Sequence, residues 1–291
     1  MDSVRRGRAV EPGRSGTARQ WLGRLINRFL EPLDIAVTSA GALATHRTLS
    51  WTARRYSTLV TEVEALLREV TFPDLPSRGG RAKLLAEHDG TSVIEAMYLL
   101  DRLHRALPLD GDVCEFGVAR GASSVLIANE LIESDKRLWL FDSFEGLPAP
   151  TEKDILIDDI DGLGSIAAYE GEMAFPADLV EMRLREIGFP AERTRIVPGF
   201  FPRSLERGEL PAAVCFAYID FDFYEPILAA LRFLDPWLSA GGYIVVDDYG
   251  FFSSGAKTAV DEFVAEQDLT YEFTLPLAAA GKFCILRKAG E

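Results

Sequence analysis

The sequence predicts an α/β protein: a doubly wound, mostly parallel sheet with helices on both faces, preceded by a helical N-terminal extension. Two observations support this fold class. From Asp110 onwards, short apolar segments alternate with amphipathic ones, which is the pattern of strands and helices in a parallel sheet. Before Asp110, apolar residues recur mainly at helical spacing.

The composition is that of a globular protein. Hydrophobic residues make up 48% and charged residues 26% of the 291 residues, which argues against a disordered chain, a collagen or a disulfide scaffold. The net charge of −14 disfavours nucleic-acid binding, because phosphate contacts depend on cationic side chains.

Three features predict a cytoplasmic protein without a membrane span. Cys114, Cys215 and Cys284 each lie in an apolar run, which indicates buried thiols in a reducing compartment. No apolar run reaches the roughly 18 residues that a membrane span needs. The N-terminus lacks the apolar core of a signal peptide.

The first 108 residues divide into a tail and an extension. Residues 1–18 are rich in Arg, Gly, Ser and Pro and are predicted to be disordered. Residues 19–108 are predicted to be a helical extension, with helices at 20–30, 50–72 and 91–107 and a connector at 73–90. The basic helix at 20–30 either contacts a membrane or a partner, or docks on its own protein or across a dimer.

Residues 109–291 are predicted to form one domain with seven strands. The strand candidates are 112–118, 137–142, 193–199, 214–222, 242–248, 270–275 and 282–288, and helices are expected after Arg120 and near 179–187, 225–238 and 257–267. A short Leu-Ala-Ala-Ala-Gly turn between the last two strands favours an antiparallel hairpin. An open sheet of this kind binds its ligand beyond the carboxyl ends of its strands.

The first such strand end carries a glycine turn. Gly117 and Gly121 follow Glu115 in Glu-Phe-Gly-Val-Ala-Arg-Gly, so the backbone could pass close to a ligand at a helix N-terminus. The turn has neither the G-x-G-x-x-G nor the P-loop pattern, and Glu115 would repel phosphate. A cationic or zwitterionic ligand fits better, although a tight turn without a ligand explains the same residues.

The second strand end carries Asp142, 27 residues after Glu115. An acid at this position can accept hydrogen bonds from both ribose hydroxyls of a nucleoside, and Phe144 could flank an adenine. A nucleoside without a pyrophosphate indicates S-adenosylmethionine. The alternative is an aspartate that only caps a helix or turn.

The strongest signal is a group of acids at two later strand ends. Asp220 and Asp222 follow one strand, and Asp247 and Asp248 follow the next. Carboxylates that converge there repel one another unless a cation or protons intervene, and oxygen ligands favour Mg²⁺, with Ca²⁺ or Mn²⁺ as alternatives. Solvated acids that cap strand ends remain the alternative.

A divalent cation beside a methyl donor predicts a mechanism. The cation would lower the pKa of a substrate hydroxyl, and a base would take its proton. The histidines, His46, His88 and His104, all precede the glycine turn, so Asp220 is the predicted base. The acidic segment 150–176 is predicted to be either a lid over the substrate or a solvated loop.

These motifs together resemble the macrolide-sugar O-methyltransferases, which include the macrocin and mycinamicin enzymes of antibiotic biosynthesis. The likeness covers roughly residues 91–288 and rests on the segments EFGVARG, FDSFEGLP, VPGFF, IDFDFYE and GGYIVVDDY. It implies a class I methyltransferase fold, S-adenosylmethionine and Mg²⁺ as cofactors, a glycosylated or sugar-like small-molecule acceptor, and a homo-oligomer.

The resemblance also assigns residues. Mg²⁺ would be held by Asp220, Asp247 and Asp248, and the acceptor would contact Glu225 and Tyr249. The cofactor would be bound by Glu115, Phe116, Gly117, Val118, Ala119, Gly121, Asp142, Ser143, Phe144, Glu145, Gly146, Pro198 and Gly199. The chain departs from the family at Ala119, where Trp is frequent, and at Phe221, where Gly is frequent.

The predicted function is therefore cation-dependent methylation of a hydroxyl in a sugar diol on a natural product. Two alternatives remain open at this point. A catechol-type or phenolic O-methyltransferase would use the same cation chemistry. A non-catalytic nucleoside-binding scaffold would bind the cofactor without turnover.

Overall fold

The computed structural model describes residues 40–88, 90–207, 209–267 and 270–290. Contacts divide the chain into two units, Met1–Tyr56 and Ser57–Glu291, and the sheet lies in the second. The predicted tail and the predicted helix at 20–30 lie outside the described residues, and the domain boundary near residue 109 stays a prediction. In the described part of the chain, no helix is long and apolar enough to cross a membrane.

The sheet has the seven predicted strands. Its order is β3-β2-β1-β4-β5-β7-β6, and β7 runs antiparallel to both of its neighbours. The prediction of a mostly parallel sheet with a terminal hairpin is thus confirmed. The strands are β1 (Asp112–Phe116), β2 (Leu138–Asp142), β3 (Thr194–Pro198), β4 (Val214–Ile219), β5 (Leu238–Val246), β6 (Tyr271–Thr274) and β7 (Cys284–Lys288).

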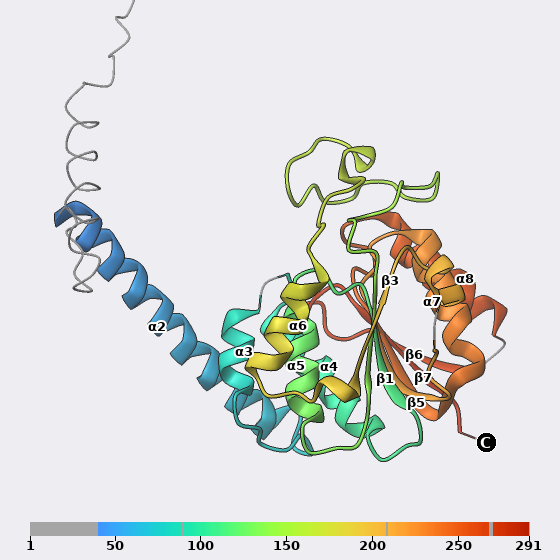
Figure 1. Ribbon diagram of the computed structural model, residues 1–291, viewed down its shortest axis with the longest axis horizontal. Coiled ribbons are helices and arrows are strands. Elements are labelled where there is room, and N and C mark those ends of the chain that lie inside the picture. The colour runs from blue at the N-terminus through green and yellow to red at the C-terminus, as the bar shows by residue number, and fades with distance from the viewer. Residues whose placement is uncertain (1–39, 89, 208, 268–269, 291) are drawn as a thin grey trace, which may run out of the picture. The chain divides into compact units, whose positions relative to one another are not determined.

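Helices cover both faces of the sheet (Figure 1). Alternate residues of one strand enter two separate cores, as a pleated strand requires. In β4, Phe216 and Tyr218 face the core that contains α4 and α5, whereas Ala217 and Ile219 face the core that contains α7 and α8. The helices of the sheet region are α4 (Val93–Ala106), α5 (Ala122–Leu131), α6 (Ala177–Glu186), α7 (Tyr224–Trp237) and α8 (Ser254–Glu266).

Two more helices precede α4, and one of them corrects a prediction. α2 (Ala40–Val70) includes the predicted helix at 50–72, but the predicted connector at 73–90 contains a helix, α3 (Arg81–Glu87). A seven-residue helix is too short to be stable on its own, so tertiary contacts must hold it. Arg81 and Leu85 are buried, and the Arg81 guanidinium contacts Glu130 of α5 at 2.6 Å.

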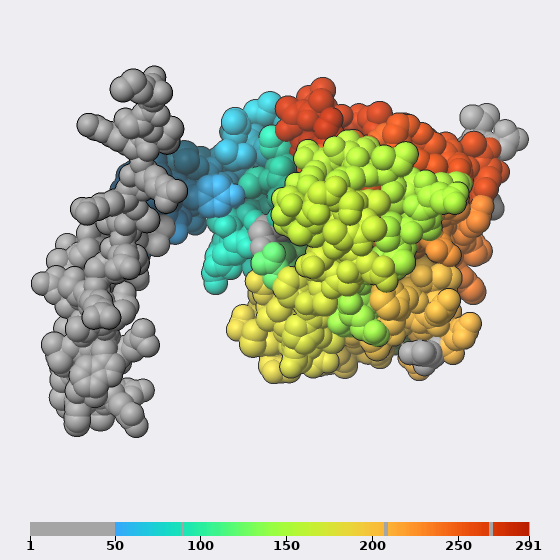
Figure 2. Space-filling view, turned by 90° about the horizontal axis from the view of Figure 1, so that it is seen from above, coloured from blue at the N-terminus to red at the C-terminus, as the bar shows by residue number. Residues whose placement is uncertain are grey.

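The segment 150–176 lies beyond the sheet edge and contains a short 3₁₀ turn, η2 (Ile166–Tyr169). It covers the centre of the face seen in Figure 2. Buried Asp154 accepts hydrogen bonds from the backbone N–H groups of Thr151 and Tyr224, both within 2.8 Å. Tyr169 and Phe252 pack edge to face, so both ends of the segment are anchored to the domain.

Candidate active site

A cavity of about 660 Å³ opens at the carboxyl edge of the sheet. The β1–α5 loop, the end of β2, the segment 150–176 and the ends of β4 and β5 all line it. This is where an open parallel sheet binds ligands. Seven of its lining residues are acidic: Asp142, Asp161, Glu172, Asp220, Asp222, Asp247 and Asp248.

Backbone hydrogen bonds fix the strand ends at this edge. The Asp220 N–H donates to the Phe116 carbonyl at 2.7 Å, and the Asp247 N–H donates to the Ile219 carbonyl at 2.9 Å. Gly117 makes this approach possible, because a Cβ at its position would lie 1.8 Å from the Asp220 carbonyl oxygen. Its φ of 86° also favours glycine. The glycine turn and the acids are therefore neighbours.

Asp142 binds the glycine turn directly. Its Oδ2 accepts hydrogen bonds from the backbone N–H groups of Val118 at 2.6 Å and Ala119 at 3.0 Å, and its Oδ1 accepts one from Phe144 at 2.7 Å. A carboxylate has about four acceptor sites, so capacity remains for a ligand hydroxyl. Asp142 thus orders the loop from which the cavity is built.

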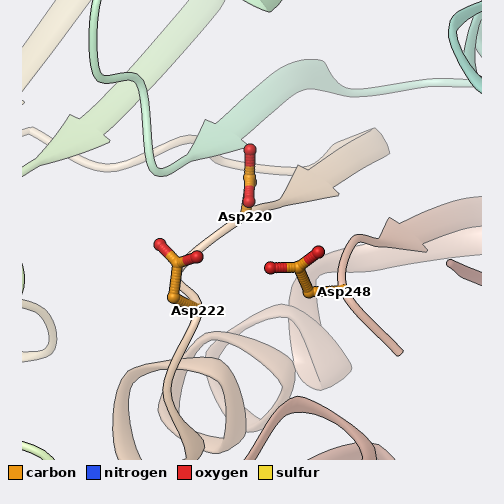
Figure 3. Close-up of side chains that lie close together, drawn as sticks. All are labelled: Asp220, Asp222 and Asp248. Atoms are coloured by element: carbon orange, nitrogen blue, oxygen red, sulfur yellow. The ribbon is translucent and has the colours of Figure 1, made fainter. Parts of the chain in front are cut away.

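Three carboxylates meet in the cavity. Asp220, Asp222 and Asp248 each offer an oxygen within 4.8 Å of the other two. Figure 3 shows Asp222 and Asp248 pointing toward one another, with Asp220 beside them. Asp222 and Asp248 have φ values of 62° and 55°, a left-handed conformation that is unusual outside glycine and clusters at functional sites.

Asp247 lies against this cluster but points to other donors. Its Oδ2 accepts a hydrogen bond from the Tyr218 hydroxyl at 2.6 Å, and its Oδ1 accepts one from the Asp248 N–H at 2.8 Å. The sequence placed Asp247 among the metal ligands. In the structure the grouped oxygens come from Asp220, Asp222 and Asp248, and Asp247 supports the backbone of Asp248.

The clustered carboxyl groups of the cavity repel one another when ionised, so either protonation or a bound cation stabilises them. Desolvation, together with the charges of Asp247 and Asp248, raises the pKa of Asp220 well above its usual range. Desolvation and neighbouring carboxylates also raise the pKa of Asp222 and of Asp248. Oxygen ligands that repel one another fit a hard divalent cation, so the residues present suit Mg²⁺.

Glu95 of α4 is a further acid behind the cluster. It is 4% exposed, and its Oε1 has no hydrogen-bond partner. Desolvation and the nearby Asp247 raise the pKa of Glu95 to about 11. The helical region thereby places an acid next to the cluster, and no pattern in the sequence predicted it.

Glu115 lies beneath the glycine turn and is fully buried. Ser123 of α5 donates a hydrogen bond to its Oε1, whereas its Oε2 has no partner among the described atoms. Desolvation raises the pKa of Glu115 to about 7 despite the hydrogen bond from Ser123. An unpartnered carboxylate oxygen here suits a cationic ligand better than a phosphate.

The structure separates the predicted site residues into two groups. Those that line the cavity are Gly117, Val118, Ala119, Asp142, Ser143, Gly146, Asp220, Asp247 and Asp248. Those that lie outside its lining are Glu115, Phe116, Gly121, Phe144, Glu145, Pro198, Gly199, Glu225 and Tyr249. Phe116, for example, is fully buried and stacks on Phe141.

Several lining residues carried no predicted role. Phe200, Phe201, Met173, Phe175 and Ile160 add apolar surface to the acidic cavity. Aromatic residues after β3 and in the segment 150–176 are the sequence feature from which an apolar wall of the cavity could have been predicted. Nothing in the spacing indicated that these two segments face one cavity.

A known protein family matches the greater part of the chain. The family described as macrocin O-methyltransferase matches residues 101–285. The chain belongs to the macrocin O-methyltransferase family. The resemblance seen in the sequence is thereby confirmed.

Two curated relatives are similar over about half of the chain. A tetracenomycin-rhamnoside 4′-O-methyltransferase of Streptomyces olivaceus is 32% identical over 156 residues, 53% of this chain and 58% of the relative. Demethyldecarbamoylnovobiocin O-methyltransferase of Streptomyces niveus is 32% identical over 167 residues, which are 56% of this chain and 61% of the relative. The chain thus matches about three-fifths of the length of these relatives.

Structural similarity confirms the fold. The structure of the O-methyltransferase NovP superposes with a TM-score of 0.59 and 23% identity, covering 81% of this chain and 100% of that chain. The chain therefore has the class I methyltransferase fold, with the strand order 3-2-1-4-5-7-6 and helices N-terminal to it.

Proposed function

We propose that this protein transfers a methyl group from S-adenosylmethionine to a hydroxyl of a sugar on a natural product, with the help of a divalent cation such as Mg²⁺. The observation that carries the proposal is the meeting of Asp220, Asp222 and Asp248 in the cavity that the glycine turn lines. Family membership and the names of the relatives, which act on a rhamnosyl tetracenomycin and a novobiocin precursor, support it.

We place both small molecules in this one cavity. We assign the cofactor to the side formed by Gly117, Val118 and Asp142, which lacks a pyrophosphate pattern and has acids nearby. S-adenosylmethionine supplies a sulfonium methyl, a cationic group that the acidic lining favours. The apolar side chains of Phe200 and Met173 would exclude water from the reacting atoms.

We assign the cation to Asp220, Asp222 and Asp248, with Asp247 holding Asp248 in place. A bound divalent cation would supply Lewis acidity toward a sugar hydroxyl. Asp220 is the proposed proton acceptor, because its carboxylate would lie beside the sugar hydroxyl that the cation binds. The segment 150–176 would act as a lid over the acceptor, since Ile160 and Asp161 line the cavity.

A methyl-transfer assay tests the proposal. Labelled S-adenosylmethionine is incubated with glycosides that carry vicinal hydroxyls and, in parallel, with catechols, in Mg²⁺ and in EDTA. We expect transfer to a glycoside that stops in EDTA and returns when Mg²⁺ is added. Turnover of catechols alone would contradict the acceptor class, and turnover that persists in EDTA would contradict the cation.

A further inference from the structure

The turn that carries Asp222 is strained. The Phe223 N–H donates a hydrogen bond to the Phe221 carbonyl at 2.6 Å, and Asp222 between them has a φ of 62°. These features describe a γ-turn with positive φ, which is rare and costs energy. Such a turn persists only where the surrounding structure holds it. The residues that hold it therefore also decide where the Asp222 carboxylate points.

Two side chains hold this turn. Buried Ser253 donates its hydroxyl hydrogen bond to the Asp222 carbonyl at 2.8 Å. Asp154 accepts a hydrogen bond from the Tyr224 N–H through its Oδ1, also at 2.8 Å. Tyr224 is the first residue of α7, where free N–H groups and the helix dipole favour a carboxylate. Asp154 is the contact that comes from the segment 150–176.

The second oxygen of Asp154 holds the beginning of that segment. Its Oδ2 accepts hydrogen bonds from the backbone N–H of Thr151 at 2.7 Å and from the Thr151 hydroxyl at 2.8 Å. Asp154 is only 3% exposed, and hydrogen bonds to an ionised acceptor are about twice as strong as neutral ones. One buried carboxylate thus links the segment 150–176 to the turn at Asp222.

The start of α8 closes around this carboxylate. A Cβ at Gly255 would lie 1.8 Å from the Asp154 Oδ1, so only glycine fits there. The adjacent Ser254 hydroxyl donates to the Lys153 carbonyl at 2.7 Å and accepts from the Ile155 N–H at 2.9 Å. The carboxylate therefore cannot shift unless the backbone on both sides of it shifts as well.

The same segment reaches the cavity a few residues later. Ile160 and Asp161 line the cavity, six and seven residues after Asp154. Asp154 itself lies outside the cavity lining. It can therefore affect the acid cluster only through the turn that it holds.

We propose that Asp154 is a positioning residue that couples the segment 150–176 to the carboxylate of Asp222. This inference rests on the proposed function, because it concerns the cation site of that function. Coupling between two sites is reciprocal. Whatever orders the segment should strengthen cation binding, and a bound cation should order the segment.

Cation binding gives the first test. We expect Asp154→Asn to raise the Mn²⁺ dissociation constant of the full chain by about 10-fold in titration calorimetry, because the amide nitrogen must face an N–H donor and one contact is lost. Binding of S-adenosylhomocysteine without metal should change little. The matched control is Asp159→Asn. Asp159 is an acid of the same segment that also accepts two backbone N–H groups and a hydroxyl, and its variant should keep the wild-type Mn²⁺ affinity.

The outcomes separate this inference from the proposed function. Unchanged Mn²⁺ affinity in Asp154→Asn would overturn the inference alone, and so would an equal loss in Asp159→Asn. An equal loss of S-adenosylhomocysteine binding would show general damage to the fold and would also overturn the positioning role. A wild type that binds no Mn²⁺ would contradict the cation site of the proposed function, and this inference with it.

Hydrogen exchange followed by mass spectrometry tests the coupling from the other side. In the wild type, Mg²⁺ should slow backbone exchange severalfold in residues 150–158. Thr151→Val removes only the hydroxyl that binds Asp154, so it provides a test even if Asp154→Asn does not fold. The slowing should be weaker in this variant. Exchange that Mg²⁺ does not change in the wild type, or equal slowing in both proteins, would overturn the proposal.

Discussion

At the residue scale, the site depends on acids held in positions they would not adopt freely. Asp222 and Asp248 have left-handed backbones, and Asp220 is fixed by its N–H bond to β1. Each arrangement costs on the order of 1 kcal/mol or more in strain or charge repulsion. Strained residues of this kind cluster at functional sites, and a divalent cation would relieve the repulsion.

Asp220→Asn tests the proposed base. We expect methyl transfer to fall by roughly 1000-fold, because the amide cannot accept the proton and general-base catalysis is worth about 10²–10⁴. Binding of S-adenosylhomocysteine, measured by calorimetry, should change little. Asp158→Asn, an exposed acid of the segment 150–176, is the matched control. Near-normal turnover of Asp220→Asn would remove this residue from the mechanism.

Asp142→Asn tests the cofactor side of the cavity. The amide retains one acceptor oxygen, so the loop loses charge-assisted hydrogen bonds worth about 1.5–3 kcal/mol each. We expect the dissociation constant for S-adenosylmethionine to rise by about 10-fold or more. Asp135→Asn changes an exposed acid outside the cavity lining and should leave this dissociation constant unchanged. Equal effects of both variants would argue for a general charge effect instead.

At the scale of the elements, the position of each strand end decides the shape of the site. The turn after β1 passes so close to β4 that only glycine fits at residue 117. The turn after β2 is similarly tight, because a Cβ at Gly146 would lie 2.3 Å from the Gly171 carbonyl oxygen. Gly117 thus sets how closely the glycine turn approaches Asp220, and Gly146 sets how closely the turn after β2 approaches the segment 150–176.

Gly117→Ala should therefore disrupt the edge of the sheet. The methyl group meets backbone atoms on β4, and the positive φ is unfavourable for alanine, so we expect a loss of about 3 kcal/mol or more in unfolding free energy. Gly79→Ala adds a methyl group with no atom within 4 Å and is the control. Denaturant unfolding measures both. Equal midpoints would show that β1 and β4 can move apart at no cost.

A buried ion pair attaches the short helix α3 to α5. Arg81 and Glu130 have fully buried side chains, and His104 adds a second contact to Glu130 at 2.7 Å. Arg81→Met should lower the unfolding free energy by roughly 3–5 kcal/mol, because it leaves a buried carboxylate without its main partner. Lys83→Met on the exposed side of α3 should change little. If Arg81→Met lowers the unfolding free energy by less than about 1 kcal/mol, water has replaced the guanidinium as the partner of Glu130.

Helix α3 is the part of the fold that could not be predicted from the sequence. The strands were predictable because each is an apolar run between turn residues. α3 was not, since Gly79-Gly80 and a charged composition resemble a loop and its stability comes from Glu130, far away in the chain. Asp222 was predicted to lie among the converging acids, but the resemblance assigned the cation to Asp220, Asp247 and Asp248. Glu95 was missed as a neighbour of this cluster, because it belongs to helix α4, which lies far away in the chain.

At the scale of the whole molecule, the acid cluster should couple stability to pH and to cations. The carboxylates of Asp220, Asp222 and Asp248 have pKa values in the folded protein above those of the unfolded chain. The folded state therefore binds more protons than the unfolded state once the pH exceeds the usual carboxyl range near 4. By linkage, stability must fall as the pH rises through that interval, the opposite of the trend for salt-bridged acids.

In EDTA the melting temperature should thus be lower at pH 8 than at pH 5.5, because the unfolded chain releases these protons more readily than the folded cluster does. A divalent cation binds the ionised form of the folded state only, so millimolar Mg²⁺ or Ca²⁺ should raise the melting temperature at pH 8 and flatten the slope. The variant Asp220→Asn/Asp222→Asn/Asp248→Asn should not respond to the cation and should show a shallower slope with pH than the wild type, because only Glu95 and Glu115, among the carboxyl groups of the described residues, then retain a raised pKa. If the wild type and this variant show the same slope in EDTA, the cluster does not control it, and if Mg²⁺ stabilises both equally, the cation binds elsewhere.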